Sequence, residues 1–245
     1  MKKLLITGFE PFGGEEINPS WEAVKLLPDE INGYTLEKLL LPVVFGKGAE
    51  TVIEAAGELR PDVILCIGQA GGRCAITPEL VGINIRHASI PDNNGCLPTD
   101  ESIIPGGESA YFTTLPARRM AEAIKASGIP SEVSYSAGTY VCNDVLYTLL
   151  SRFKGTDTRV GFIHIPYSKR ILIVPFFFTI VSFTKTSVKR RLFVTTVQMA
   201  NIAKPCATEH RFACPAFFRV KGGNRSCARH EIVPKANGRN VAKAR

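Results

Sequence analysis

The chain has 245 residues and a formal net charge of +8; 45% of its residues are hydrophobic and 21% are charged. These values are ordinary for a globular protein with one sizeable core or at most two small ones. Residues 168–245 hold 16 of the 30 Lys and Arg against two Glu, whereas residues 1–167 hold 14 basic and 20 acidic residues. The larger part is therefore mildly acidic, which argues against a body that binds nucleic acid through its overall charge.

Strand and helix patterns alternate along residues 1–167. The continuous apolar run DVILCIG is typical of a strand that is covered on both faces. Asn18 followed by Pro19 predicts a helix start, because Asn caps a helix and Pro suits its first turn. In chain order we predict a strand at 3–9, a helix after Asn18, a strand at 35–43, a helix at 48–59, a strand at 62–68, a helix at 116–127, a strand at 131–136, a helix at 141–153 and a strand at 159–165.

This alternation predicts an α/β fold, a three-layer α/β/α sandwich with a mostly parallel, twisted sheet of the kind seen in phosphorylase-like and hydrolase-like proteins. Residues 69–110 interrupt the alternation with a segment rich in Gly, Pro, Asp and Asn. A loop region of this length is uncommon in a compact domain unless it is functional. After Tyr167 the strand and helix patterns end, and we expect residues 168–245 to form a poorly ordered basic tail.

The cysteines and apolar runs indicate a cytoplasmic protein. Seven cysteines without a repeating spacing fit a reducing compartment better than a disulfide framework. The apolar run after Lys2 and Lys3 is too short for a signal peptide. The longest apolar run, 171–183, is too short to span a bilayer as a helix and contains Pro175. We therefore expect no membrane association.

Candidate functional residues follow the predicted strands, where ligands gather in open α/β sheets. The sharpest candidate is Cys142, which opens a predicted helix. A thiol at a helix N-terminus is expected to favour the thiolate, and the free backbone N–H groups there suit an oxyanion. Its plainer interpretation is a small apolar residue in the first helical turn. The same edge of the sheet is predicted to collect Phe9, Phe12, Gln69, Glu79, Cys142 and His164.

A base and an acid for this thiol are available, although each has a plainer interpretation. A single His in an apolar strand is more often a hydrogen-bonded core residue, and His87 is a second candidate base. His164 is favoured because it ends the last predicted strand. Glu79 could orient its imidazole, or could simply be a solvated loop carboxylate.

Taken together, these stretches resemble pyroglutamyl peptidase type I, the pyrrolidone-carboxylate peptidases. The resemblance covers essentially all of residues 1–167 and keeps the family's order of motifs. The matching stretches are LITGFEPFGG, NPSWEAV, CIGQAGGR, ITPELVGIN, IPDNNG, SAGTYVCN and GFIHIPY.

The resemblance implies a cysteine exopeptidase that removes N-terminal pyroglutamate from peptides through an acyl-enzyme, without a cofactor or metal. By position, Cys142 matches the nucleophile, His164 the general base and acid, and Glu79 the residue that holds the imidazole. Homo-oligomers are common in the family. The positions matching the substrate pocket are Phe9 and Phe12, which would sandwich the lactam ring, and Gln69, Tyr140 and Val141.

Two features depart from the family. Ser89 stands where many members have Arg, with Arg86 and His87 nearby, so an electrostatic contribution to the site is expected to be weaker or supplied differently. From Ser168 onward nothing resembles the usual C-terminal helix, and a shifted reading frame is the simplest explanation. One face of the sheet would then lack its usual cover.

Alternative interpretations remain. The chain could be a catalytically impaired member of the family whose basic tail binds polyanions nonspecifically. A nucleoside phosphorylase-like enzyme shares the architecture but would not explain the three candidate catalytic residues. A zinc site is a weak alternative because the spacing lacks a C-x2-C pair; its ligands would be Cys206, Cys214, Cys227 and His230.

Overall fold

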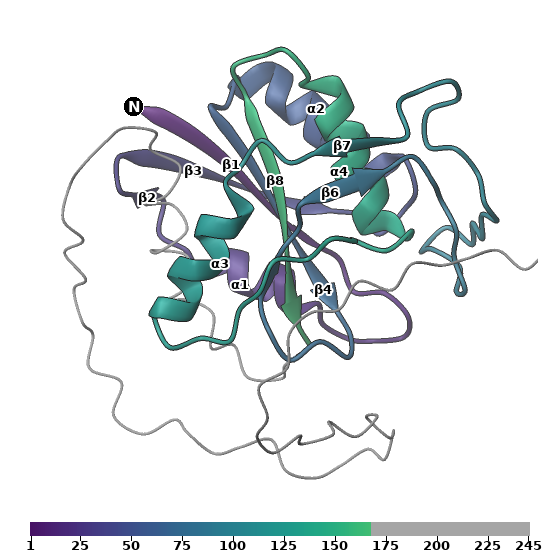
Figure 1. Cartoon of the computed structure of the whole chain (residues 1–245), viewed down its shortest axis with the longest axis horizontal. Helices are drawn as coiled ribbons and strands as arrows, with labels where there is room; N and C mark the ends of the chain where they lie inside the picture. Colours follow the sequence, from purple (N-terminus) through teal and green to yellow (C-terminus); the bar gives the residue numbers. More distant parts are fainter. Residues whose placement is uncertain (168–245) are drawn as a thin grey trace, which may run out of the picture. The chain divides into compact units, whose positions relative to one another are not determined.

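A computed structural model describes residues 1–167 of the chain (Figure 1). The predictions for residues 168–245, namely the poorly ordered basic tail, the missing C-terminal helix and the zinc ligands, lie outside the described residues. Within residues 1–167 no helix has the length and apolar composition that crossing a bilayer requires.

The centre of the fold is a six-stranded sheet in the order β2-β3-β1-β4-β8-β5. The four inner strands are parallel, and the short edge strands β2 and β5 run antiparallel to their neighbours. This confirms the predicted mostly parallel sheet. Its strands are β1 (Lys2–Phe9), β2 (Glu30–Ile31), β3 (Tyr34–Leu41), β4 (Val63–Ala70), β5 (Thr77–Pro78) and β8 (Arg159–Pro166).

Helices cover both faces of this sheet, which confirms the three-layer arrangement (Figure 1). Successive strand residues point to opposite faces, so Ile163 joins the apolar cluster of one face and Phe162 that of the other. The first cluster includes residues of α1 and α3, and the second includes residues of α2 and α4. The helices are α1 (Pro19–Lys25), α2 (Lys47–Leu59), α3 (Ala117–Ala126) and α4 (Val141–Arg152).

The predicted start of α1 is confirmed in detail. Asn18 is the N-cap, and its side-chain oxygen accepts hydrogen bonds from the Ser20 amide at 3.0 Å and the Ser20 hydroxyl at 2.8 Å. The Asn18 amide nitrogen also donates to the carbonyl of Glu10 at 2.9 Å. The cap therefore fixes both the helix and the loop that leaves β1 toward it.

The predicted strand at 131–136 is wrong as a regular strand. Ser131 and Ser134 form only isolated parallel bridges, with Ile76 and Glu79 respectively. The segment follows Pro130 and has few apolar residues to bury, and Tyr135 is 61% exposed. It lies beside β5 without the continuous hydrogen-bond ladder of a strand.

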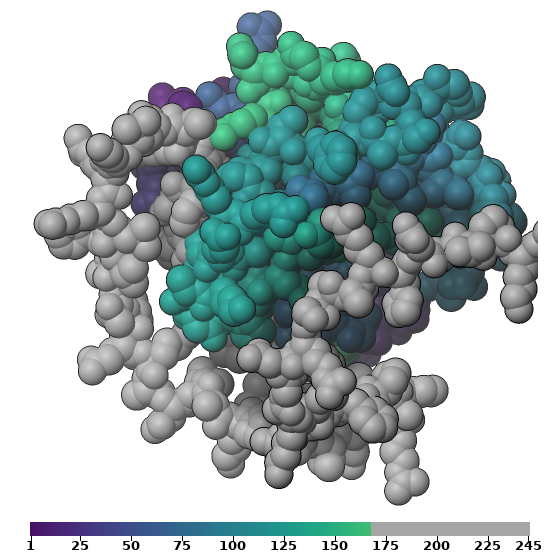
Figure 2. Space-filling view, viewed as in Figure 1, coloured from purple at the N-terminus to yellow at the C-terminus, as the bar shows by residue number. Residues whose placement is uncertain are grey.

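Residues 84–109 form a long irregular segment between β6 (Val81–Ile83) and β7 (Ala110–Phe112), which pair as a two-stranded sheet. Arg86 Nε lies 2.5 Å from the buried Asp144 Oδ1 of α4, and Asp144 Oδ2 accepts from the Gly46 amide. These contacts hold the segment against the body, and Figure 2 shows its blue-green atoms forming a continuous surface with the rest of residues 1–167.

Candidate active site

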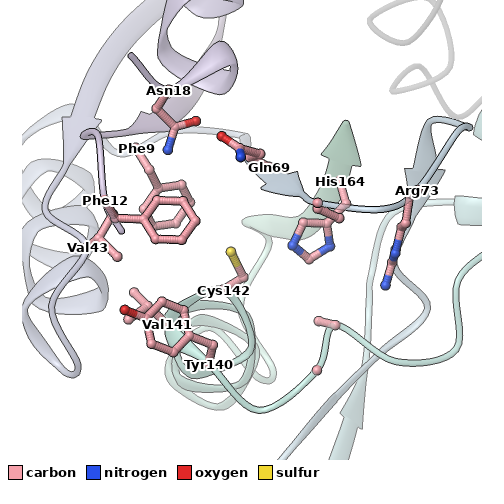
Figure 3. A pocket seen from close by; sticks show the side chains of 14 residues that line it. Phe9, Phe12, Asn18, Val43, Gln69, Arg73, Tyr140, Val141, Cys142 and His164 are labelled. Atoms are coloured by element: carbon pink, nitrogen blue, oxygen red, sulfur yellow. The ribbon is translucent and has the colours of Figure 1, made fainter. Parts of the chain in front are cut away.

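The predicted candidates meet in one cavity of about 240 Å³ at the carboxyl ends of β1, β4 and β8 (Figure 3). Seven of the eight predicted catalytic and pocket residues line this cavity. The eighth, Glu79, is not part of the lining but contacts His164. The cavity is lined by Phe9, Phe12, Asn18, Val43, Gln69, Ala70, Gly71, Arg73, Ala137, Gly138, Tyr140, Val141, Cys142 and His164.

His164 and Glu79 form a buried pair. The Nδ1 of His164 lies 2.7 Å from Oε1 of Glu79, and the two side chains are 4% and 0% exposed. A carboxylate can only accept a hydrogen bond, so Nδ1 carries the proton and Nε2 is the acceptor nitrogen of the neutral ring. His164 therefore has an oriented imidazole with a free acceptor nitrogen, which could act as a base.

The pKa values of this pair agree with a neutral imidazole beside an ionised carboxylate. Burial lowers the pKa of His164, although the charge and hydrogen bond of Glu79 act in the opposite direction. Burial alone would raise the pKa of Glu79, but the hydrogen bonds and charges around it, first those of His164, hold that pKa below its usual value.

Cys142 lies in the first turn of α4, as predicted. Of the residues that the structure describes, none accepts a hydrogen bond from the backbone N–H of Val141 or Cys142, as is usual at a helix N-terminus. The register of the parallel strands places Gly68 beside His164. A Cβ atom on Gly68 would lie only 2.9 Å from Cys142 Sγ, so the sulfur rests over this glycine.

The prediction that Cys142 favours the thiolate is wrong for the resting thiol. Its pKa is raised to about 12, first by burial and then by the negative charge of Glu79. The favourable field of a helix N-terminus is worth about 0.3–1 kcal/mol at an exposed site, which is small beside the cost of burying a charged sulfur. The thiol therefore needs a base to become a nucleophile.

The remainder of the cavity wall is aromatic and amide-like. Phe9 and Phe12 lie together on the side opposite His164, and Tyr140 closes the wall beside Cys142 (Figure 3). The Phe12 and Tyr140 rings are 6.1 Å apart between centroids. The side-chain oxygen of Gln69 is buried and has no hydrogen-bond partner among residues 1–167, so a ligand N–H can use it.

Sequence reasoning missed one charged residue of this site. Arg73 lines the cavity and donates to Glu79 Oε1 at 2.8 Å. The sequence feature that could have indicated it is the position of Arg73 at the end of the GQAGGR stretch, six residues before Glu79. By contrast, Arg86 pairs with Asp144, and Ser89 lines a second cavity that shares Gly71 and Tyr140 with the first.

His87, the alternative base, is directed elsewhere. Its Nδ1 lies 3.0 Å from Asp100 Oδ1, and both side chains are largely exposed. It lines the second cavity and not the one that contains Cys142. Within residues 1–167, His164 is therefore the histidine that shares a cavity with the thiol.

Comparisons with known proteins identify the family to which this chain is similar. The family model described as Pyroglutamyl peptidase (Peptidase_C15) matches residues 2–196. The pyrrolidone-carboxylate peptidase of Levilactobacillus brevis is 53% identical over 167 residues, covering 67% of this chain and 82% of the relative. The pyrrolidone-carboxylate peptidase of Thermococcus onnurineus is 52% identical over 167 residues, covering 67% and 84%.

Solved structures give the same relationship. The crystal structure of pyroglutamyl peptidase I from Bacillus amyloliquefaciens is 50% identical, with a TM-score of 0.67 over 69% of this chain and 81% of that one. The pyrrolidone carboxyl peptidase of Fervidobacterium islandicum is 41% identical, with a TM-score of 0.66 over 68% and 82%. The chain belongs to the pyroglutamyl peptidase family and is an enzyme of that type.

Proposed function

We propose that this protein is a cysteine exopeptidase that releases N-terminal pyroglutamate from peptides, with Cys142 as nucleophile, His164 as general base and acid, and Glu79 as the acid that orients the imidazole. The observation that carries the proposal is the buried 2.7 Å contact between His164 and Glu79, beside a cavity that also contains the Cys142 thiol. A positioned nucleophile, base and orienting acid form the constellation that acyl transfer requires.

The cavity suits a flat, neutral, cyclic residue. Phe9 and Phe12 offer apolar faces to a lactam ring, and the unpaired oxygen of Gln69 offers an acceptor for the lactam N–H. The backbone N–H groups at the start of α4 can donate hydrogen bonds to the scissile carbonyl oxygen as negative charge develops on it.

The same cavity disfavours an ordinary N-terminus. None of the cavity-lining residues within 1–167 is Asp or Glu, whereas Arg73 is a cation. A free α-ammonium group would lose its water without gaining a counter-charge, and this desolvation costs free energy that pyroglutamate does not pay. This absence of a carboxylate supplies the selectivity for the cyclised residue.

The reaction follows from the protonation states. His164 Nε2 takes the thiol proton as Sγ attacks the pyroglutamyl carbonyl carbon, because the thiol is protonated at rest. The imidazolium then donates that proton to the leaving peptide nitrogen as the C–N bond breaks, leaving a thioester. Water, deprotonated by His164, attacks the thioester, and pyroglutamate and the free thiol are released.

The test is hydrolysis of a pyroglutamyl-coumarin conjugate by the full chain. Wild-type protein should release the coumarin, and Cys142→Ser and His164→Gln should each lower kcat by at least about 10³-fold. Cys96→Ser, which removes an exposed thiol, is the matched control and should leave turnover unchanged. Prolyl-coumarin, which has a ring of the same size with a charged nitrogen, should be a poor substrate. Full activity of Cys142→Ser would disprove the assignment of the nucleophile.

A further inference from the structure

Arg73 holds the acid of the proposed triad from behind. Its Nη1 donates to Glu79 Oε1 at 2.8 Å and to Thr77 Oγ1 at 2.5 Å, and its Nη2 donates to the carbonyl of Ser136 at 3.0 Å. The Arg73 side chain is 31% exposed, whereas that of Glu79 is fully buried. The guanidinium therefore joins a buried carboxylate to two neighbouring segments.

Arg73 and His164 share one oxygen atom. Glu79 Oε1 accepts from His164 Nδ1 at 2.7 Å and from Arg73 Nη1 at 2.8 Å. The arginine supplies a permanent positive charge and a hydrogen bond to the carboxylate, which adds to the larger effect of His164 in lowering the pKa of Glu79. The same charge opposes protonation of His164 and makes the imidazolium a better acid toward the leaving amine.

The third contact of Arg73 reaches the segment that carries the nucleophile. Ser136 lies six residues before Cys142, and Gly138 between them adopts a φ of +79° that few other residues tolerate. The backbone there has no regular secondary structure until α4 begins. The bond from Arg73 to the Ser136 carbonyl therefore fixes this segment relative to Glu79.

No other basic side chain of the described residues can take this place. Arg73 is the one Lys or Arg within residues 1–167 that lines the catalytic cavity. Arg86 is engaged with Asp144. A lysine would supply the charge but not the planar fork that reaches Glu79 and Ser136 together.

We propose that Arg73 is a positioning residue of the reaction, which holds Glu79 against His164 and anchors the segment leading to Cys142. This inference rests on the proposed function, because its effect is exerted through the triad.

The test compares Arg73→Met and Arg73→Lys with the wild-type full chain on the pyroglutamyl-coumarin conjugate. In Arg73→Met kcat should fall about 10- to 100-fold, as for a reacting group displaced by a fraction of an ångström to 1 Å, while KM changes less than about threefold. The acid limb of the kcat/KM profile should move to higher pH, because a positive charge near His164 is gone. Arg73→Lys should restore the position of the acid limb but only part of kcat.

The matched control is Arg118→Met, which removes an exposed arginine whose guanidinium contacts the hydroxyl of Tyr135. It should leave kcat, KM and the pH profile unchanged. Wild-type kcat and an unmoved acid limb in Arg73→Met would overturn the inference. If the wild-type chain itself does not hydrolyse the conjugate, the proposed function fails separately.

The inference can still be tested in that case by NMR titration of the His164 imidazole, assigned with His164→Gln. A higher pKa of His164 in Arg73→Met than in wild type supports the role, and an unchanged pKa refutes it. If Arg73→Met does not fold, the same titration and kinetic measurements are made on Arg73→Lys. A wild-type kcat in Arg73→Lys would refute the role of the guanidinium fork in positioning Glu79 and the Ser136 segment.

Discussion

Replacing Gly68 with Ala is the sharpest test of the geometry around the thiol. The added Cβ would lie 2.9 Å from Cys142 Sγ and 2.7 Å from two carbons of the Phe162 ring. Ordinary non-bonded contacts are about 3.5–4.0 Å, so the neighbours must move by roughly 0.6–1.3 Å. Phe162 is 1% exposed and packed in the core, and its ring centroid is 4.9 Å from that of His164.

The steric clash can be relieved by moving either the Cys142 sulfur or the Phe162 ring, and each movement would disturb the site. A shift of the sulfur by about 1 Å costs on the order of 10²-fold in rate, and movement of Phe162 displaces the base that packs on it. Overpacking a well-packed core costs roughly 1–3 kcal/mol of unfolding free energy. For a domain of this size each kcal/mol lowers Tm by about 2–4 °C.

The assay measures kcat/KM on the pyroglutamyl-coumarin conjugate together with Tm by calorimetry. Gly68→Ala should lower kcat/KM by about 10²-fold and lower Tm by several degrees. The control is Gly57→Ala in α2, where a Cβ meets nothing within 4 Å and alanine should stabilise the helix by up to about 1 kcal/mol. Wild-type activity and Tm in Gly68→Ala would refute the close approach of Sγ to β4.

Three further outcomes follow from the same contacts. Asn18→Ala should cost about 0.5–2 kcal/mol in urea unfolding, because the α1 cap and a bond to the preceding loop are lost; an unchanged midpoint would contradict it. Arg86→Met should cost about 3–5 kcal/mol, since the fully buried carboxylate of Asp144 loses its cation, and Asp144→Asn in the same background should recover part of that loss. The pKa of His164 is lowered in the folded state, so on acidification the imidazole is protonated at higher pH in the unfolded chain than in the folded one. Proton uptake then favours the unfolded chain, and the free energy of unfolding should fall as pH drops below about 6.5. His164→Gln should flatten that part of the stability curve, and an identical curve would contradict the depressed pKa.

The fold could be predicted well where burial alone determines the structure. The run DVILCIG is apolar on both faces because β4 lies between two layers of helices, and six of its seven residues are in fact buried. The helix that follows Asn18 was predictable because capping is local chemistry. The segment 131–136 was mistaken because β propensity does not reveal whether a neighbouring strand offers a complete hydrogen-bond ladder.

The site was predictable where a residue's place follows from the end of an element. His164 lies near the carboxyl end of β8, and Cys142 lies in the first turn of α4, so parallel strand order brings both to one edge. The interaction of Arg73 with Glu79 could not be read in this way, because Arg73 follows a turn in which Gly72 has a φ of +82°. The direction in which such a turn sends the next side chain depends on backbone angles that hydrophobic periodicity does not encode. The raised pKa of Cys142 was missed for a related reason, because the depth of burial is a property of the assembled fold.

These charges explain why the site combines a protonated thiol with a neutral base. A permanent thiolate in this buried cavity would be costly, so the thiol stays protonated until a substrate carbonyl is present. In the proposed mechanism, Glu79 then stabilises the imidazolium that forms on His164, while Arg73, bonded to the same oxygen, limits that stabilisation. If Glu79 stabilised the imidazolium more strongly, His164 would keep the proton that the leaving amine requires. In the proposed mechanism, the shared oxygen of Glu79 would therefore balance proton removal from Cys142 against proton delivery to the departing peptide.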